Sequence, residues 1–321
     1  MPHPFATHVG IRRLVTAAIA APSVHNTQPW RFRCEDARVL ELHADEDRRL
    51  PVLDPRGRAL HISCGAALLN LRLAIRVTGY RPLVQPIPDA SRRPTLLASV
   101  RALRAPGPSL TDAELYAAIP LRHTSRRPFS ERPVPQEVRR ELVAAARAEG
   151  VTLSLPGPQA TAYLLSLVAA ADQELAADPG YLAELARWTC DGGRADGVPA
   201  YAFGPRPSGR GVPVRDFGLA RPLPGREVDH FAARPQLGVL MTRGDEPEDW
   251  LRAGQALQRV LLTATRRGVS ASPMTQPLDM RDRRPGVPRT AGHIQAIIRL
   301  GYGPPVPGSP RRPFPEVLER A

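Results

Sequence analysis

Lysine is missing from this sequence of 321 residues, although lysine and arginine together number 44 and the net charge is +13. Aromatic residues make up only 5% of the chain. A nucleic-acid surface needs basic residues gathered in a patch with interleaved aromatic residues, whereas these arginines are scattered, often in pairs. With 37 prolines and 25 glycines, the arginine excess indicates a compositional bias. Nucleic-acid binding is therefore not expected.

Cysteine is also scarce. Cys34, Cys64 and Cys190 are odd in number and widely spaced, so they form neither a disulfide framework nor a CxxC motif. A structural zinc site would need clustered ligands, which the sequence lacks. We expect reduced thiols in a cytoplasmic protein without a metal ion.

The sequence has no apolar run near the roughly 20 residues that a membrane-spanning helix needs. Arg12-Arg13 precedes the apolar run Leu14–Ala21, an order that superficially resembles a signal peptide. That run is short, contains Thr16 and leads directly into a polar loop. An amphipathic first helix is the better interpretation, and no membrane association is expected.

Apolar periodicity in the rest of the chain predicts both helices and strands. Helices are expected at 8–20, 61–78, 111–119, 135–149, 158–176, 180–189 and 250–267. Strands are expected at 30–43, 83–87, 95–103, 151–155, 237–242 and 294–300. Residues 191–235 are rich in Gly, Pro, Arg and Asp, and a segment of that length without regular structure is typically functional or disordered. We expect it to be a lid-like insertion.

The two longest predicted helices look related. Residues 63–80 align without gaps on residues 252–269, and the alignment matches Gly65 with Gly254 and Gly79 with Gly268. Leucine and alanine matches arise by chance between apolar helices, so the glycines carry most of the weight. An internal duplication would divide the chain into halves at 1–118 and 119–321.

One polar stretch is rigid. Pro22-Ser-Val-His-Asn-Thr-Gln-Pro29 lies between a helix and a strand, and its prolines fix φ and remove two backbone donors. Such a loop is where a scaffold places ligand contacts. A second polar segment, Arg122-His-Thr-Ser-Arg126, opens the second half. Taken alone, the first could be a capped loop and the second a solvated basic face.

Together these segments resemble the nitroreductase-fold family of FMN proteins. The loop, extended to Trp30, is similar to the PS-x-x-N-x-QPW signature, and residues 122–126 are similar to the Arg-x-Ser/Thr-x-Lys/Arg segment. An ordinary member begins with the Arg segment and has the PS loop about one helix later, whereas here the order is reversed. That arrangement resembles the Acg branch, in which one chain carries two nitroreductase-like halves. Residues 271–277 and 310–313 also look Acg-like.

The resemblance implies an α+β fold with two pseudo-twofold-related halves, mostly antiparallel sheets and a buried helical interface. In ordinary members FMN lies at a dimer interface, where one subunit supplies the Arg segment and the other the PS loop. Here each half keeps only one of these, which implies one FMN per chain and a monomer that mimics a dimer. The implied cofactor-binding residues are Pro22, Ser23, Val24, Asn26, Gln28, Arg122, His123, Thr124, Arg126, Ala271, Ser272, Arg311 and Arg312.

Each implied role has a chemical reason. A phosphate favours charge-assisted, bidentate donors, which Arg122, Arg311 and Arg312 would supply. By the resemblance, Arg126 lies beside the flavin pyrimidine ring, where a cation raises the reduction potential. Asn26 would bond the polar edge of the ring. His25 and His123 are interpreted as surface or satisfied loop residues rather than acid–base catalysts.

The expected function is two-electron flavin chemistry on a small organic substrate, with NAD(P)H as a possible reductant. The cofactor carries the chemistry, so no catalytic side chain is identified. The alternative is an FMN-sequestering or storage protein, whose lid at 191–235 excludes nicotinamide. A third reading, a tailoring dehydrogenase or oxidase for a small metabolite, would use the same site.

Overall fold

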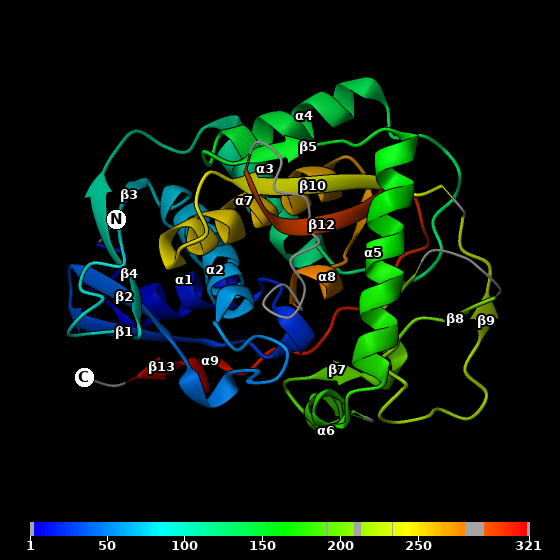
Figure 1. Ribbon diagram of the computed structural model, residues 1–321. Coiled ribbons are helices and arrows are strands. Elements are labelled where there is room, and N and C mark those ends of the chain that lie inside the picture. Colours follow the sequence, from blue (N-terminus) through cyan, green and yellow to red (C-terminus); the bar gives the residue numbers. More distant parts are fainter. Residues whose placement is uncertain (1–2, 191, 209–212, 233, 280–291, 320–321) are drawn as a thin grey trace.

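The computed structural model describes residues 3–190, 192–208, 213–232, 234–279 and 292–319. Two β-sheets lie on either side of a pair of long helices, α2 (Arg58–Arg76) and α7 (Pro247–Arg266) (Figure 1). Both sheets are antiparallel apart from one short parallel pair. The expected α+β class, with mostly antiparallel sheets and a buried helical interface, is confirmed.

The first sheet has the strand order β13-β1-β2-β4-β3. Its strands are β1 (Trp30–Asp36), β2 (Val39–Ala44), β3 (Tyr80–Pro86), β4 (Leu96–Arg104) and β13 (Leu318–Glu319). The single strand predicted at 30–43 is therefore wrong, because a tight turn at residues 37–38 divides it into an antiparallel hairpin. The apolar side chains of β1 and β2, such as Trp30, Phe32 and Leu40, are fully buried against α1 (His8–Ile19) and α2.

The second sheet repeats the first. Its order is β11-β12-β10-β5, with strands β5 (Thr152–Ser154), β10 (Gln236–Thr242), β11 (Ser270–Pro273) and β12 (His293–Gly301). Read from β1 or β5, each sheet has the order first, second, fourth, third, and the long helix follows the second strand in both. The fold thus consists of two halves with one topology, and α4 (Gln136–Arg147) stands where α1 stands in the first.

Gly65 and Gly254 lie where α2 and α7 cross. A Cβ atom on Gly65 would come within 2.1 Å of the Leu251 carbonyl oxygen, and one on Gly254 within 2.0 Å of the Ile62 oxygen. Leu251 and Ile62 each precede the neighbouring glycine by three residues, so the contact is symmetric. Glycine is therefore required at both positions by the close approach of the two backbones.

Both long helices begin earlier than their apolar periodicity predicts. The Asp54 carboxylate accepts hydrogen bonds from the Ala59 and Leu60 amides, so α2 starts at Arg58 instead of residue 61. Burial raises the pKa of Asp54 to about 6. A capping box between Glu246 and Asp249, with Pro247 in the first turn, starts α7 three residues before Trp250.

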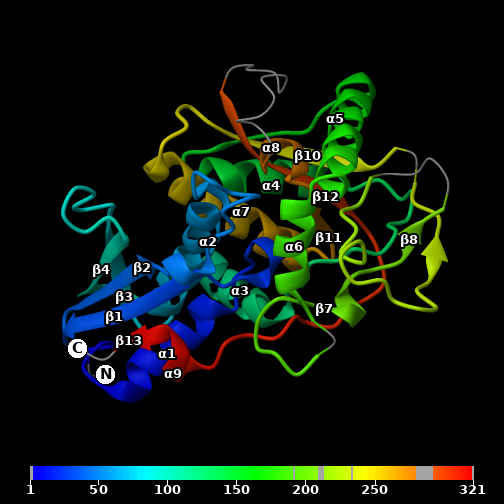
Figure 2. The same ribbon diagram turned by 60° about the horizontal axis from the view of Figure 1, so that its bottom comes forward.

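The halves differ most where β1 turns into β2. In the second half, the connection between β5 and β10 runs from residue 155 to 235. It contains α5 (Pro158–Ala176), α6 (Pro179–Arg187), β6 (Thr189–Cys190), β7 (Val198–Pro199), β8 (Arg206–Pro207) and β9 (Val228–Asp229). These elements lie together on one side of the molecule (Figure 2). The lid proposed at 191–235 is the second part of this insertion, and residues 191, 209–212 and 233 lie outside the described residues.

The remaining elements join the halves. Helix α3 (Leu110–Ala118) ends at the proposed boundary and packs on both α2 and α7. The C-terminal segment returns to the first half through α9 (Phe314–Val317), and β13 pairs in parallel with β1. This path carries Arg311 and Arg312 past the loop at 22–29. No helix in the described ranges is long and apolar enough to cross a membrane.

Candidate flavin site between the two halves

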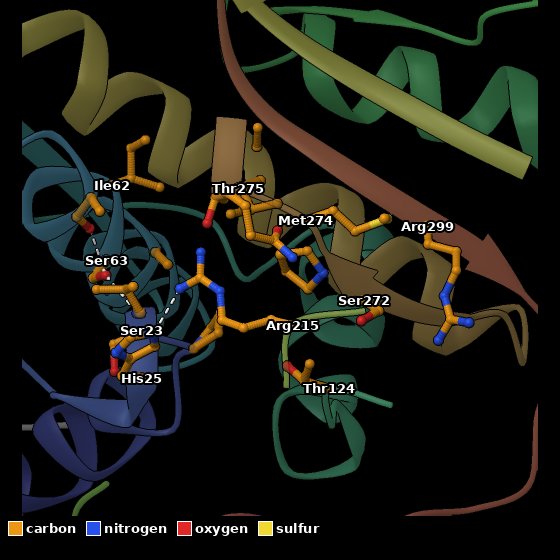
Figure 3. Close-up of a pocket in the computed structure, with 18 of the residues that line it drawn as sticks. Ser23, His25, Ile62, Ser63, Thr124, Arg215, Ser272, Met274, Thr275 and Arg299 are labelled. Carbon is orange, nitrogen blue, oxygen red and sulfur yellow. Dashed lines mark hydrogen bonds between the residues drawn. The ribbon is translucent and has the colours of Figure 1, made fainter. Parts of the chain in front are cut away.

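A cavity of about 980 Å³, its open mouth included, lies where the halves meet. Its walls come from distant parts of the chain: loop residues 22–25, the start of α2, Thr124 and Arg126, insertion residues 214–217, and residues 272–276 with β12. Figure 3 shows Ser23, His25, Thr124, Arg215 and Ser272 converging on this space.

A smaller cavity adjoins the first and shares Pro22, Ser23, Thr124 and Arg126 with it. Its other walls include Asn26, Arg122, His123 and Arg311. The first half and the second half thus each contribute one motif to a continuous two-part site. Val24 and Ser272 line the larger part only.

Two arginines in the smaller cavity carry charge without a counterion. Arg122 is only 5% exposed, and its Nε atom has no hydrogen-bond partner. Burial, with a smaller contribution from Arg311, lowers the pKa of Arg122 to about 9, and burial lowers that of Arg311 to about 10. Within the described ranges, neither forms an ion pair with a carboxylate. Two buried like charges are unfavourable unless an anion joins them, so this cavity has the charge to accept an anionic group.

The loop between Pro22 and Pro29 has an unusual backbone. His25, Asn26 and Gln28 have φ angles of 47°, 53° and 51°, the left-handed region that non-glycine residues seldom adopt. Each such residue costs on the order of 1 kcal/mol, so the surrounding structure must hold the loop in place. The Ser23 hydroxyl accepts from the Gln28 amide at 2.9 Å and closes the loop on itself.

The insertion holds one side of this loop. Asn26 and Gly197 exchange two hydrogen bonds, from Asn26 Nδ2 to the Gly197 carbonyl at 2.9 Å and from the Gly197 amide to the Asn26 carbonyl at 3.2 Å. Gln28 Nε2 donates to the Ala195 carbonyl at 2.8 Å. Arg48 bridges the Thr27 carbonyl and the Asp196 carboxylate. The loop and the insertion therefore form one docked unit.

The C-terminal segment holds the other side. Arg311 Nη1 donates to Asn26 Oδ1 at 3.1 Å, and Arg311 Nη2 donates to the carbonyls of Ala20 and Ala21. The Arg312 amide donates to Gln28 Oε1 at 2.8 Å, while the Arg312 guanidinium pairs with the buried Asp45 carboxylate at 3.2 Å. Asn26 Nδ2 also donates to the Pro310 carbonyl, so both the nitrogen and the oxygen of this amide have protein partners.

Three residues implied as cofactor contacts line neither cavity. The Gln28 side chain accepts a hydrogen bond from the Arg312 amide, so these two residues support the loop instead of lining a cavity. Ala271 lies in β11, where its carbonyl accepts from the Ser125 amide at 3.1 Å. Its contribution is to hold the segment that carries Thr124 and Arg126, because Thr124 forms an isolated parallel bridge with Ala271.

Arg126 is held by the insertion. Its Nη1 atom donates to the Ala202 carbonyl at 2.9 Å, and its guanidinium lies 4.6 Å from the centre of the Phe217 ring. Burial lowers the pKa of Arg126 to about 10, with Arg215 as the second cause. Its cationic side chain belongs to both cavities, so it can contact a ligand that spans them.

Sequence reasoning missed the arginines that complete the larger cavity. Arg58 donates to the Gln295 carbonyl and pairs with Asp279 at 3.3 Å, and Arg215 pairs with Asp279 at 2.6 Å. Arg299 donates to the Ser125 and Arg127 carbonyls on either side of Arg126. Nothing local distinguishes these three from the other arginines of the sequence. One partial signal was available: Asp54 is a helix-capping residue, and it would have placed Arg58 near the start of a helix.

The two histidines differ. His123 is exposed, in agreement with a surface role, whereas His25 is 4% exposed and lines the larger cavity. Its ring contacts Phe217 edge-on at 5.4 Å. Among the described residues, no group of three or more His, Cys, Asp or Glu side chains could hold a metal ion.

No model of a protein family matches the chain. Two curated relatives from Mycobacterium tuberculosis (strain ATCC 25618 / H37Rv) match along almost their whole length. The chain is 36% identical over 321 residues to "Putative NAD(P)H nitroreductase Rv3131", covering 96% of this chain and 91% of the relative. It is 32% identical over 329 residues to "Putative NAD(P)H nitroreductase acg", covering 99% and 98%.

Solved structures of nitroreductases also resemble the chain. A "putative nitroreductase" from Anabaena variabilis covers 91% of this chain and 87% of its own, with a TM-score of 0.45 and 11% identity. A nitroreductase with bound FMN from Desulfitobacterium hafniense covers 65% and 98%, with a TM-score of 0.38 and 14% identity.

Proposed function

The chain belongs to the Acg-like branch of the nitroreductase family, and from this premise we propose that it is an FMN-dependent oxidoreductase. The observation that carries the proposal is the pair Arg122 and Arg311, which lie in a small cavity without a carboxylate partner among the described residues. A phosphate monoester supplies the charge that this cavity lacks. The larger cavity beside it shares four wall residues with this cavity, so it would take the attached ring.

The residues of each cavity fit one part of FMN. Arg122 and Thr124 would bind the phosphate through charge-assisted and hydroxyl hydrogen bonds, and Arg311 would add its positive charge and its unpaired Nε donor. Ser23, Val24 and Ser272 would surround the ring, and Arg126 would lie where a cation favours the reduced state. When bound, FMN supplies two-electron transfer between a reductant and a second substrate. Asn26 and Gln28, whose polar groups are taken by the insertion and the C-terminal segment, would position the loop.

Reductant and turnover can be tested together. We expect the purified protein to be yellow and its flavin absorption to bleach when NADH or NADPH is added without oxygen. An organic oxidant added afterwards should restore the colour. The measurement is an anaerobic absorption titration, with boiled protein plus free FMN as the control. Protein that retains FMN but is bleached by neither nicotinamide would contradict the enzyme assignment.

One observation favours a second candidate, a protein that sequesters FMN. The insertion docks on the loop through Asn26 and Gln28 and places Arg215 and Phe217 in the wall of the larger cavity. A ring bound there would be covered on that side, and a nicotinamide would have to displace the insertion. Tight retention of FMN without bleaching in the titration above would support this candidate over the first.

We also propose one FMN per chain, in a cytoplasmic monomer that arose by internal duplication. In the first half, the Ser63 hydroxyl accepts from the Val24 amide and lines the cavity. The aligned position in the second half is Arg252, which pairs with Glu248 at 2.7 Å. The loop before β5 has neither Pro-Ser nor Asn, so the second half lacks the elements of a second site.

This arrangement predicts the number of FMN molecules that each chain binds. Fluorescence titration of flavin-free protein with FMN should reach saturation at one FMN per chain, and the same protein should sediment as a monomer. An ordinary dimeric arrangement would give the same ratio of one FMN per chain, so sedimentation is the measurement that distinguishes it from a monomer. Saturation at two FMN per chain, or a stable dimer in sedimentation, would refute the proposal.

A further inference from the structure

His25 is the titratable side chain of the larger cavity whose role the proposed function leaves open. It stands on a loop with left-handed backbone and is 4% exposed. Its Nε2 atom lies 2.6 Å from Nη1 of Arg215, which the insertion supplies. Its Nδ1 atom is buried without a partner among the described residues. Figure 3 shows Arg215 reaching across the cavity toward His25.

The contact allows only one protonation state of the imidazole. A guanidinium is always protonated and has donors but no acceptor. In a hydrogen bond at 2.6 Å, the Nε2 atom of His25 must therefore be the acceptor and carry no proton. A neutral imidazole keeps one proton, which then has to lie on Nδ1.

The neighbours of His25 agree with this state. Arg215 approaches from the insertion, Arg126 from the segment at 122–126, and the Tyr181 ring from α6 at 6.5 Å. Asp279 pairs with Arg215 at 2.6 Å and with Arg58 at 3.3 Å, and Asp172 of α5 also acts electrostatically on Arg215. Burial first, then Arg215 and Arg126, lower the pKa of His25 well below its ordinary value. Cations and burial thus both oppose a charged His25.

We propose that Arg215 is a positioning residue that locks His25 in its neutral, Nδ1-protonated form while the insertion is docked. In this state His25 offers no acidic proton to the cavity. When Arg215 withdraws, Nε2 becomes free to take a proton from solvent. Docking of the insertion therefore controls whether the cavity holds a general acid.

The consequence rests on the proposed function. Two-electron reduction of a small organic substrate adds a hydride and a proton. A protonated His25 can give its Nε2 proton to the substrate atom beside the one that receives the hydride, and it returns to the neutral form. With Arg215 in place this route is closed, and the proton has to come from water. The docked form of the insertion then favours retention of FMN over catalytic turnover.

The lock is tested on flavin-free protein, so its failure is separate from a failure of FMN binding. The measurement is imidazole ¹⁵N NMR, with the His25 signals assigned by their loss in His25→Gln. In the unmodified protein, Nδ1 should be protonated and Nε2 unprotonated across the range of about pH 5 to 8, in which an ordinary histidine titrates. A protonated Nε2 anywhere in that range would overturn the proposal without any variant.

Substitutions at Arg215 give the second arm. In Arg215→Met, Nε2 no longer has to accept a hydrogen bond, so its signal should move toward that of a protonated nitrogen as the Nε2-protonated form becomes populated. Arg215→Lys keeps a donor and should keep the original signals. The matched control is Arg206→Met, which removes an exposed arginine of the same insertion. Unchanged His25 signals in Arg215→Met would show that Arg215 does not set the tautomer.

Discussion

Arg122→Met is expected to weaken FMN binding by about 100-fold while leaving riboflavin binding almost unchanged. The side chain is buried, its Nε atom has no partner, and its weak contact with the Ala20 carbonyl is 3.5 Å long. Charge-assisted hydrogen bonds contribute roughly 1.5–3 kcal/mol each, and two of them from one guanidinium account for this loss. Riboflavin has the same ring without the phosphate, so it reports on the larger cavity alone. Quenching of flavin fluorescence measures both affinities.

The stability of the flavin-free variant separates this effect from misfolding. Removing a buried charge that has no counterion is neutral or stabilising, so Arg122→Met should unfold at the same denaturant concentration as the parent or at a higher one. Arg12→Met removes an exposed arginine of α1 and serves as the matched control. Equal losses of FMN and riboflavin affinity, or no loss of either, would place the phosphate elsewhere.

Gly65→Ala is expected to lower the free energy of unfolding by about 3 kcal/mol or more. The added Cβ would lie 2.1 Å from the Leu251 carbonyl oxygen and 3.0 Å from the Cα atom of Gly254. These are backbone atoms, so a side chain cannot rotate away and the two helices have to separate. This is the upper end of the cost of overpacking a core. Urea denaturation of both proteins measures the difference.

The control for this substitution is Gly107→Ala, since a Cβ at Gly107 meets nothing within 4 Å. Its effect should stay within about 0.5 kcal/mol. Flavin affinity should fall in Gly65→Ala as well, because Ile62, Ser63 and Ala66 beside the crossing line the larger cavity. A Gly65→Ala protein as stable as the parent would show that the helices are not in contact at this point.

Local sequence accounts for the main helices, for most of the strands and for the two motifs. The apolar periodicity of α2 and α7 and the glycines after them are local signals, and they predict buried helices directly. The hairpin turn at 37–38 was missed because the residues on both sides have strand character. The starts of α2 and α7 were missed because their caps, Asp54 and the Glu246–Asp249 box, precede the apolar stripe.

Part of the candidate site was also predicted from local signals. Pro22, Ser23, Arg122 and Thr124 lie in short motifs, and the structure brings them to one two-part cavity. Gln28 and Arg312 belong to the same motifs but bond each other behind the loop, which no local pattern reveals. Arg58, Arg215 and Arg299 were not predicted because each depends on a partner more than 60 residues away.

The sequence by itself determined the two motifs and their order in the chain, since a motif is a matter of residues close together in the chain. Only the tertiary structure decided how the two motifs lie relative to each other. The glycines at the crossing of α2 and α7 set how closely the halves approach, and the insertion and the C-terminal segment hold the strained loop from both sides. Contact between distant segments depends on packing, which periodicity does not encode, and this packing brings Arg122 and Arg311 to the wall of one small cavity.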